Sequence, residues 1–493
     1  MPMTPQKESV GRALATNTAV QAVGKVVSVV IGVVIVGLMT RLLGQEGFGK
    51  YSTANAFLQV FAILMDLGLN VMLVQMLGER KGDEKAERNI VSALFTLRLV
   101  MAFVVISIAP IIGWFIPSYD HELKLALFAI WGSFFFTLLN QVVVGVQQRH
   151  LKMHAVAISE VAGRVTLLVG VLIAIAHGWG LVEVVWIVSL GGFVNFLINF
   201  LVASRYADFR WNVDVAFWVH ALKRSWPIGV SVAFSLIYFK ADVLILGWVR
   251  PQSDVGVYSA AYRVLEILVA FPFMYAGVLL PIIAHAWKTG AKDAFHRLVQ
   301  RSVDAMALVT FPMIFGTLAV ATPVMTLVAS DEFTMSGDVL RILILATGAI
   351  FMATVFSHAV VALDAQKAML PWYIGTAIFA VIGYAYFIPL YGLWAAAWLT
   401  VATEVAVLVG NIVVTIQKGK RSFEWSTTFK AFVASVATYA VAWALLPLSL
   451  ALAVLGGVAV YIILVFAMKA VTPEILKELF QRPKGVASGE GSI

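Results

Sequence analysis

Hydrophobic residues run along almost the whole chain in long blocks, which short polar turns separate. A transmembrane helix needs about 20 predominantly apolar residues to cross the hydrocarbon core, so each block predicts one membrane span. The blocks cover residues 18–40, 51–77, 89–116, 122–146, 154–177, 180–203, 226–249, 255–284, 302–329, 337–363, 368–389, 391–416, 428–447 and 449–470. The pattern therefore predicts an all-α polytopic membrane protein with about 14 transmembrane helices.

Composition agrees with this fold class and excludes several functions. Hydrophobic residues make up 61% of the 493 residues, charged residues 13%, and the mean hydropathy is +0.91, which no soluble domain of this size shows. The chain has no cysteine, which excludes thiolate metal sites and thiol nucleophiles. It also contains no nucleotide-binding loop of the GxxxxGK[ST] type and no His/Asp/Glu cluster with metal-ligand spacing. We therefore expect neither an ATPase nor any other enzyme, and no cofactor.

The net charge of +8 suggests nucleic acid as a partner, but the positions of the charges exclude that reading. An even number of spans places both termini on one side, and about 25 of the 35 Lys and Arg residues fall on that side. Only Arg41, Lys50, Lys124 and Arg250 fall in turns on the other side. The positive-inside rule then predicts cytoplasmic termini, with attraction to anionic membrane lipid as a side effect.

Two segments repeat each other at a separation of about 210 residues. Gly49, Tyr51, Ser52 and Ala54 correspond at a constant offset to Gly256, Tyr258, Ser259 and Ala261. A repeat after six spans preserves orientation, and parallel repeats are typical of transporters with a substrate path between the halves. We expect a six-helix lobe over 1–203, a cytoplasmic linker over 204–225, a second six-helix lobe over 226–416, two additional helices over 417–470 and a cytoplasmic tail over 471–493.

Charged residues occur inside several predicted spans, where lone charges cost several kcal/mol. Lys240 and Asp242 lie in span seven, and Arg263 and Glu266 lie in span eight. Arg263 can pair with Glu266 at i, i+3, but depth also permits Asp242 with Arg263 and Lys240 with Glu266. Such residues usually pair, face a wet cavity and mark a transport path.

The remaining intramembrane charges lie in other spans. Lys25 belongs to a polar stripe on span one, at a depth that permits pairing with Asp66 of span two. Glu160 and Arg164 are spaced i, i+4 on span five and neutralise each other there. The polar stripe also fits simple hydrogen bonding between helices, and the Glu160–Arg164 pair fits a structural brace as well as a cavity wall.

Two further charges stand alone on their helices. Arg98 in span three has no partner on its own helix, which favours a cavity position. Glu404 in span twelve is a candidate proton-titrating carboxylate, and a structural carboxylate is the equal alternative.

The stretch from Thr40 to Ser52 (TRLLGQEGFGKYS), followed by Asp66-Leu-Gly-Leu69, resembles the opening of polysaccharide-exporting flippases of the multidrug/oligosaccharidyl-lipid/polysaccharide superfamily. The Asp242 segment and Val255-Gly-Val-Tyr-Ser-Ala-Ala-Tyr-Arg263 resemble the start of that family's second lobe. The resemblance implies two six-helix lobes with alternating access. It also implies an undecaprenyl-pyrophosphate-linked oligosaccharide as substrate, moved from the cytoplasmic to the periplasmic leaflet of a bacterial inner membrane.

For such a substrate, cationic side chains in a wet cavity would replace the hydration of the pyrophosphate. The expected substrate-binding residues are Lys25, Arg98, Arg164, Lys240 and Arg263. Those expected to be structural or ion-coupling are Asp66, Glu160, Asp242, Glu266 and Glu404. Arg263 is the first choice for headgroup contact, with Asp242 as its structural partner. A polysaccharide polymerase and a chain-length regulator are the protein partners that such a pathway implies.

Three other functions compete with this interpretation. A multidrug antiporter of the same superfamily would require carboxylates unopposed in the first lobe, whereas span one carries Lys25. A membrane-bound polymerase or ligase would require a large external loop, and no predicted external loop exceeds about a dozen residues. A peptidoglycan-precursor flippase has the same span count, and the few cations of span one argue against it.

Overall fold

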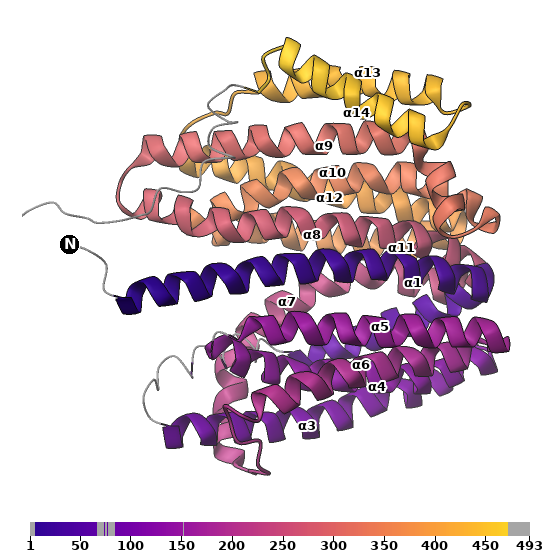
Figure 1. Cartoon of the computed structure of the whole chain (residues 1–493), viewed down its shortest axis with the longest axis vertical. Coiled ribbons are helices and arrows are strands. Elements are labelled where there is room, and N and C mark those ends of the chain that lie inside the picture. Colours follow the sequence, from indigo (N-terminus) through magenta and orange to yellow (C-terminus); the bar gives the residue numbers. More distant parts are fainter. Residues whose placement is uncertain (1–4, 67–72, 74–75, 77–83, 151, 472–493) are drawn as a thin grey trace, which may run out of the picture. The chain divides into compact units, whose positions relative to one another are not determined.

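The computed structural model describes residues 5–66, 73, 76, 84–150 and 152–471, and almost all of them are helical (Figure 1). Within this part of the chain, 12 helices are long and apolar enough to cross a membrane, and no strand occurs. The predicted fold class, an all-α polytopic membrane protein, is confirmed. From residue 472 onward, the predicted cytoplasmic tail lies outside the described part of the chain.

The helices follow the predicted spans in order. They are α1 (Pro5–Asp66), α3 (Glu84–Trp114), α4 (His121–Arg149), α5 (Met153–His177), α6 (Leu181–Ala203), α7 (Val215–Val249), α8 (Gln252–Lys288), α9 (Lys292–Val328), the short 3-10 helix η1 (Asp331–Phe333), α10 (Thr334–Ala362), α11 (Gln366–Tyr391), α12 (Leu393–Gly419), α13 (Ser426–Leu445) and α14 (Leu450–Ala467).

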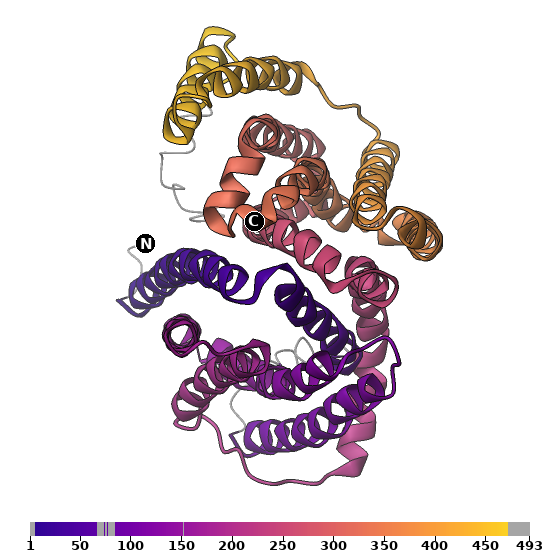
Figure 2. The ribbon, with the colours of Figure 1, turned by 90° about the vertical axis from the view of Figure 1, so that its right-hand side faces the viewer.

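Helix α1 differs from the prediction because it joins the first two predicted spans. Its backbone breaks at Gly44, where φ is 64° and ψ is −174°, so two helical arms meet at this residue (Figure 2). Glycine adopts a positive φ without the steric cost of a Cβ atom. The predicted polar turn between the spans is therefore a single-residue bend rather than a loop.

The chain folds into two compact units. The first comprises Met1–Ala261, Met325–Ser336 and Ala377–Leu399, and the second comprises Tyr262–Val324, Gly337–Thr376 and Thr400–Ile493. These boundaries do not test the predicted lobes, which stay a prediction.

In the first unit, α4 and α5 both pack against α6, and α1 packs against α5 (Figure 1). Small residues permit the α5–α6 contact, because a Cβ atom on Gly163 would lie 2.7 Å from the carbonyl oxygen of Gly191. Close backbone approach of this kind is the usual source of packing energy between helices in lipid. Leu58, Ile106 and Leu127 are buried at the centre of this unit.

In the second unit, α8 to α12 surround a buried apolar cluster that includes Ile283, Phe295, Val303 and Phe356. The hairpin of α13 and α14 packs against α9, with Ala319 of α9 buried beside Ala442 and Ala453. The two helices that were predicted as additions to the repeat therefore pack against α9.

Two glycines related by the sequence repeat meet where α1 and the start of α8 cross. A Cβ atom on Gly49 would lie 1.7 Å from the carbonyl oxygen of Gln252, and one on Gly256 would lie 1.9 Å from that of Gln45. The offset of 207 residues that relates Gly49 to Gly256 also relates Gln45 to Gln252. The contact is thus reciprocal, as an approximate twofold relation between the repeated segments requires.

Candidate functional site

Three of the predicted site residues come together on α1 and α5 of the first unit. The Nζ atom of Lys25 lies 3.2 Å from Oε1 of Glu160, and Nε of Arg164 lies 3.9 Å from the same oxygen. Two cations therefore share one carboxylate, and the trio carries a formal charge of +1. We call Lys25, Glu160 and Arg164 the charged trio.

The packing of α1 on α5 positions the charged trio. A Cβ atom on Gly24 would lie 2.8 Å from the Cβ of Ala157, and one on Gly32 would lie 2.9 Å from Nη1 of Arg164. The absence of a side chain at both glycines brings α1 close to α5 on either side of Lys25. The same close approach places the Arg164 guanidinium directly against the backbone of α1.

The charged trio lies well inside the length of α5. Glu160 is about 10 Å and Arg164 about 16 Å along the helix from Met153. The side chains of Lys25, Glu160 and Arg164 are nevertheless 46%, 30% and 38% exposed within the structure. Charges at this depth do not face hydrocarbon, so their exposed surface fits a water-filled path or a polar substrate.

The exposed parts of the Lys25 and Arg164 side chains have the chemistry to contact an anion. The Nε atom of Arg164 is shielded from solvent and has no hydrogen-bond partner among the described residues. A guanidinium binds phosphate oxygens through paired N–H groups, while an ammonium contributes a point charge. The carboxylate of Glu160 reduces the net positive charge that an anion would meet here.

Arg98 of α3 is almost completely buried. Its Nη1 donates to the carbonyl oxygen of Met65 at 2.9 Å, and its Nη2 donates to Oε1 of Gln141 at 2.6 Å. These bonds tie α3 to the end of α1 and to α4. The side chain of Asp66, the last residue of α1, lies outside the described part of the chain, as does any pairing with Lys25.

Asp242 of α7 is 1% exposed and accepts a hydrogen bond from the hydroxyl of Tyr258 at 2.6 Å. Tyr258 is itself fully buried at the start of α8, so this bond ties α7 to α8 inside the first unit. Lys240 is buried on the same helix. The structure thus gives Asp242 a bracing role, and its predicted pairing with Arg263 stays a prediction.

Two predicted sites lie in the second unit. Nη1 of Arg263 is 2.7 Å from Oε2 of Glu266, which is the i, i+3 pair that the sequence permits. Glu404 of α12 is buried at 6% exposure. The structure thus brings Lys25, Glu160 and Arg164 into one cluster with an excess of cations.

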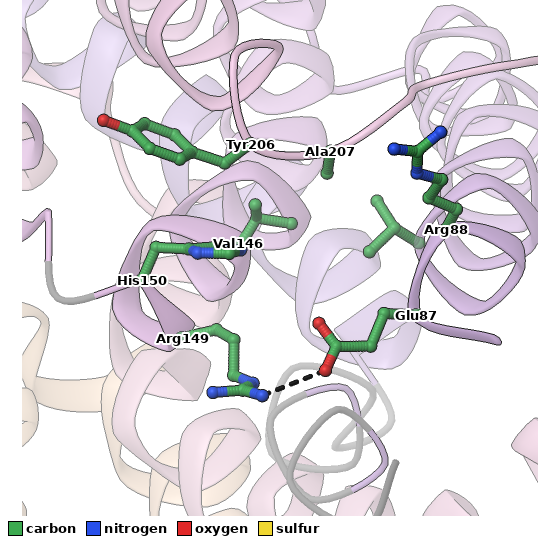
Figure 3. Close-up of a pocket in the computed structure, with 8 residues that line it drawn as sticks. Glu87, Arg88, Val146, Arg149, His150, Tyr206 and Ala207 are labelled. Atoms are coloured by element: carbon green, nitrogen blue, oxygen red, sulfur yellow. Dashed lines mark hydrogen bonds and ion pairs between the residues drawn. The ribbon is translucent and has the colours of Figure 1, made fainter. Parts of the chain in front are cut away.

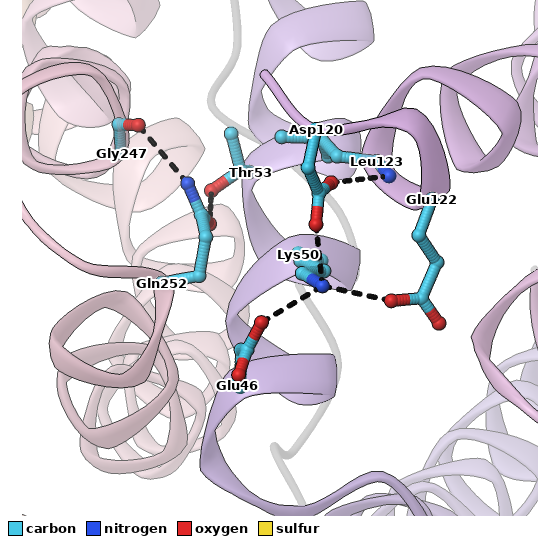
Figure 4. A network of polar contacts seen from close by, with 8 residues as sticks. All are labelled: Glu46, Lys50, Thr53, Asp120, Glu122, Leu123, Gly247 and Gln252. Carbon is cyan, nitrogen blue, oxygen red and sulfur yellow. Dashed lines mark hydrogen bonds and ion pairs between the residues drawn. The ribbon is translucent and has the colours of Figure 1, made fainter. Parts of the chain in front are cut away.

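Sequence reasoning missed a second network, which joins the part of α1 just after the Gly44 bend to the start of α4 (Figure 4). The buried Nζ of Lys50 lies 2.9 Å from Glu46, 2.6 Å from Asp120 and 2.8 Å from Glu122. Asp120 also caps α4, because its Oδ1 accepts from the backbone N–H of Leu123. The i, i+4 spacing of Glu46 and Lys50 in the sequence permits that pair to be predicted. Nothing in the sequence indicates that Asp120 and Glu122, about 70 residues further on, also contact Lys50.

The pKa of Asp120 reflects these contacts. Burial alone raises the pKa of this carboxyl group, but the hydrogen bonds from Lys50 and from the N–H of Leu123, with the charge of Lys50, outweigh burial and lower it. The network therefore stabilises the ionised carboxylate and braces α1 against α4. Among the described residues, no group of three His, Asp or Glu side chains is placed to hold a metal ion.

Two known protein families match the chain. The model of a family described as polysaccharide biosynthesis protein matches residues 14–287, more than half of the chain, and the MatE family model matches residues 227–392.

Individual relatives are distant in sequence. A Haloferax volcanii protein named as a probable low-salt glycan biosynthesis flippase is 23% identical over 62% of this chain and 62% of its own length. The chain thus spans less than two thirds of that relative. A Shigella dysenteriae protein named as a putative O-antigen transporter is 21% identical over 76% of this chain and 93% of its own length.

Solved structures share the fold. The lipid II flippase MurJ in an inward closed conformation covers 90% of this chain and 97% of its own, with a TM-score of 0.76 at 14% identity. An inward-facing multidrug resistance transporter of the MATE family covers 79% and 93%, with a TM-score of 0.65 at 15% identity. At these identities the similarity concerns the fold.

Proposed function

The chain belongs to the polysaccharide biosynthesis protein family, and from this premise we propose that it is a flippase for lipid-linked oligosaccharides. The proposal specifies undecaprenyl-pyrophosphate-linked repeat units, moved from the cytoplasmic to the periplasmic leaflet of a bacterial inner membrane by alternating access. The products would serve cell-surface polysaccharides such as O-antigen, capsule or exopolysaccharide. The names of the relatives as glycan flippase and O-antigen transporter support this substrate class.

The charged trio is the observation that carries the proposal. A sugar pyrophosphate is anionic and polar, and its polyprenyl tail stays in lipid while the headgroup crosses. Lys25 and Arg164 are exposed at a depth where only a wet path or a polar ligand can accept them, and together they outweigh Glu160. A shared carboxylate can hold the two cations in position while no headgroup is bound.

The experiment uses a host from which the gene is deleted. We expect complete lipid-linked repeat units to accumulate on the cytoplasmic leaflet, and the wild-type chain to restore their export. Lys25→Met and Arg164→Met should each lower export about tenfold or more, because each removes a charge-assisted contact with phosphate. Arg205→Ala is the control, because Arg205 is an exposed arginine in the segment after α6.

The competing function is a multidrug antiporter, which the MatE match over residues 227–392 favours. The same deletion strain separates the two functions. Unchanged pools of lipid-linked saccharide together with new sensitivity to cationic dyes would refute the flippase and support the antiporter.

A further inference from the structure

A small cavity in the second unit lies between the first turns of α9 and the segment that follows α12. Its volume is about 200 Å³, and its lining includes His296, Arg297, Arg301, Arg421 and Glu424. Three arginines thus face one glutamate around a space that fits a phosphate group. We call this cavity the α9–α12 pocket.

His296 gives the pocket an unusual feature. Its side chain is buried at 9% exposure, and its Nδ1 atom is shielded from solvent without a hydrogen-bond partner among the described residues. The ring packs against Gly419 and hydrogen-bonds to the backbone there. A buried ring nitrogen is usually satisfied. Because the ring already donates to the backbone of Gly419, Nδ1 can donate to an oxyanion only in the imidazolium form, in which both ring nitrogens carry a proton.

The segment after α12 is held firmly in place. The side chain of Gln300 donates to the carbonyl oxygen of Glu424 at 2.8 Å and accepts from its backbone N–H at 2.9 Å. Phe423 is buried and meets Phe356 edge-to-face at 5.2 Å. The pocket is therefore built before any ligand arrives, which lowers the entropic cost of binding.

A cavity of similar size in the first unit provides a comparison (Figure 3). It lies between the first turns of α3, the end of α4 and the segment after α6, and its volume is about 170 Å³. There Arg149 pairs with Glu87 at 2.9 Å, and Arg88 lies 3.5 Å from Asp208. Acidic side chains of the protein neutralise this cavity.

The charges of the α9–α12 pocket are arranged differently. Arg421 lies 3.2 Å from Asp293, but Arg297 has no ion-pair partner among the described residues. In the first-unit cavity both arginines thus lie beside carboxylates, whereas Arg297 lines the α9–α12 pocket without one among the described residues.

The surroundings indicate a lipid as the source of the anion. The pocket occupies the first turns of α9, a helix apolar enough to span the membrane, so it lies at the depth of lipid headgroups. Trp425 and Phe429, just beyond the pocket, are exposed aromatic residues of the kind found at membrane interfaces. A headgroup phosphate can enter the pocket while its acyl chains lie along α13.

We propose that the α9–α12 pocket binds the phosphate ester of an anionic membrane lipid through His296, Arg297 and Arg421. The site is separate from the charged trio and does not depend on the transported substrate. The lipid would clamp the segment after α12 to α9. Bulk anionic phospholipid and a polyprenyl phosphate carrier present the same chemistry, and the test distinguishes them.

The test measures lipid binding to the purified full chain by native mass spectrometry. Phosphatidylglycerol, undecaprenyl phosphate and phosphatidylcholine are titrated separately, each against wild type, Arg297→Gln and Arg88→Gln. Arg88→Gln is the matched control, because it removes the same charge from the first turns of α3. We expect Arg297→Gln to weaken binding of phosphatidylglycerol about tenfold, and Arg88→Gln to leave it unchanged.

The outcomes are distinct. Stronger binding of undecaprenyl phosphate than of phosphatidylglycerol, with the same loss in Arg297→Gln, would support the site and assign it to the carrier. Equal losses in Arg297→Gln and Arg88→Gln would show general attraction to basic surface and overturn the proposal. His296→Phe keeps the ring packing but removes both ring nitrogens, so undiminished phosphatidylglycerol binding in a folded His296→Phe variant would also overturn it.

Discussion

The reciprocal glycine contact between α1 and α8 makes a quantitative prediction about stability. In Gly49→Ala, the new methyl group would lie 1.7 Å from the carbonyl oxygen of Gln252, whereas ordinary contacts begin near 3.4 Å. The obstacle is a backbone atom, so no side-chain rotation relieves the overlap. The helices must separate by nearly 2 Å at this point, and the close packing around the crossing is lost.

The magnitude follows from two opposing terms. Overpacking of this kind costs typically about 1–3 kcal/mol. Alanine is favoured over glycine within a helix by about 1 kcal/mol, which offsets part of that cost. The difference is about 0–2 kcal/mol, and because the methyl group would meet a backbone oxygen we expect Gly49→Ala to destabilise the protein by an amount near the upper end, about 2 kcal/mol. Gly256→Ala should have the same effect, because its methyl group would meet the oxygen of Gln45 at 1.9 Å.

The assay is thermal unfolding of the full chain in detergent, followed by fluorescence-detected size exclusion. Gly277→Ala is the control on the same helix as Gly256, because a Cβ atom there meets nothing within 4 Å. Its Tm should equal or exceed that of the wild type, and the Tm of Gly49→Ala and Gly256→Ala should fall by a few degrees.

The double variant tests the reasoning most sharply. Once one methyl group has separated the helices, the second finds space, so the loss in Gly49→Ala/Gly256→Ala should be smaller than the sum of the single losses. Additive losses would mean that the two glycines do not share one contact. Single variants as stable as Gly277→Ala would refute the close crossing itself.

Four further predictions concern the charged and polar networks. Lys50→Met should lower the Tm, because it leaves clustered carboxylates without their cation. The lowered pKa of Asp120 in the folded protein contributes stability at pH values above the pKa of this group in the unfolded chain. The Tm of the wild type should therefore fall as the pH drops through the folded-state pKa. A Lys50→Met variant with the same acid dependence would contradict this linkage. Tyr258→Phe should cost about 1–3 kcal/mol in thermal unfolding, because buried Asp242 loses its hydroxyl donor, and an unchanged Tm would argue against this bond. Glu160→Gln should strengthen binding of a pyrophosphate-bearing lipid to the purified chain and slow its export, whereas weaker binding would show that the carboxylate supports the site.

The spans and the membrane class followed from the sequence because hydrophobic transfer energy adds up along the chain. Blocks such as 154–177 and 180–203 coincide with α5 and α6 almost residue for residue. The bend at Gly44 was harder to predict from the sequence, because a turn of a single residue adds few polar residues to the pattern. The repeat of Gly49 in Gly256 was visible in the sequence, but their mutual contact was not.

Pairing of the charges was only partly predictable. The pairs Glu160–Arg164 and Arg263–Glu266 follow from helical spacing within one element. Depth alone suggested Asp66 as a partner for Lys25, whereas the structure places Lys25 beside Glu160. Depth specifies the level of a residue in the membrane but not the direction in which it faces.

The sequence by itself determined that this chain is a polytopic membrane protein, and it contained the motifs that place the chain in its family. The tertiary structure decided which charges meet, from the charged trio to the buried Lys50. The physical reason is that membrane insertion depends on residues summed within one segment. Ion pairing depends instead on the rotation and spacing of neighbouring helices, which packing at residues such as Gly24 and Gly32 sets.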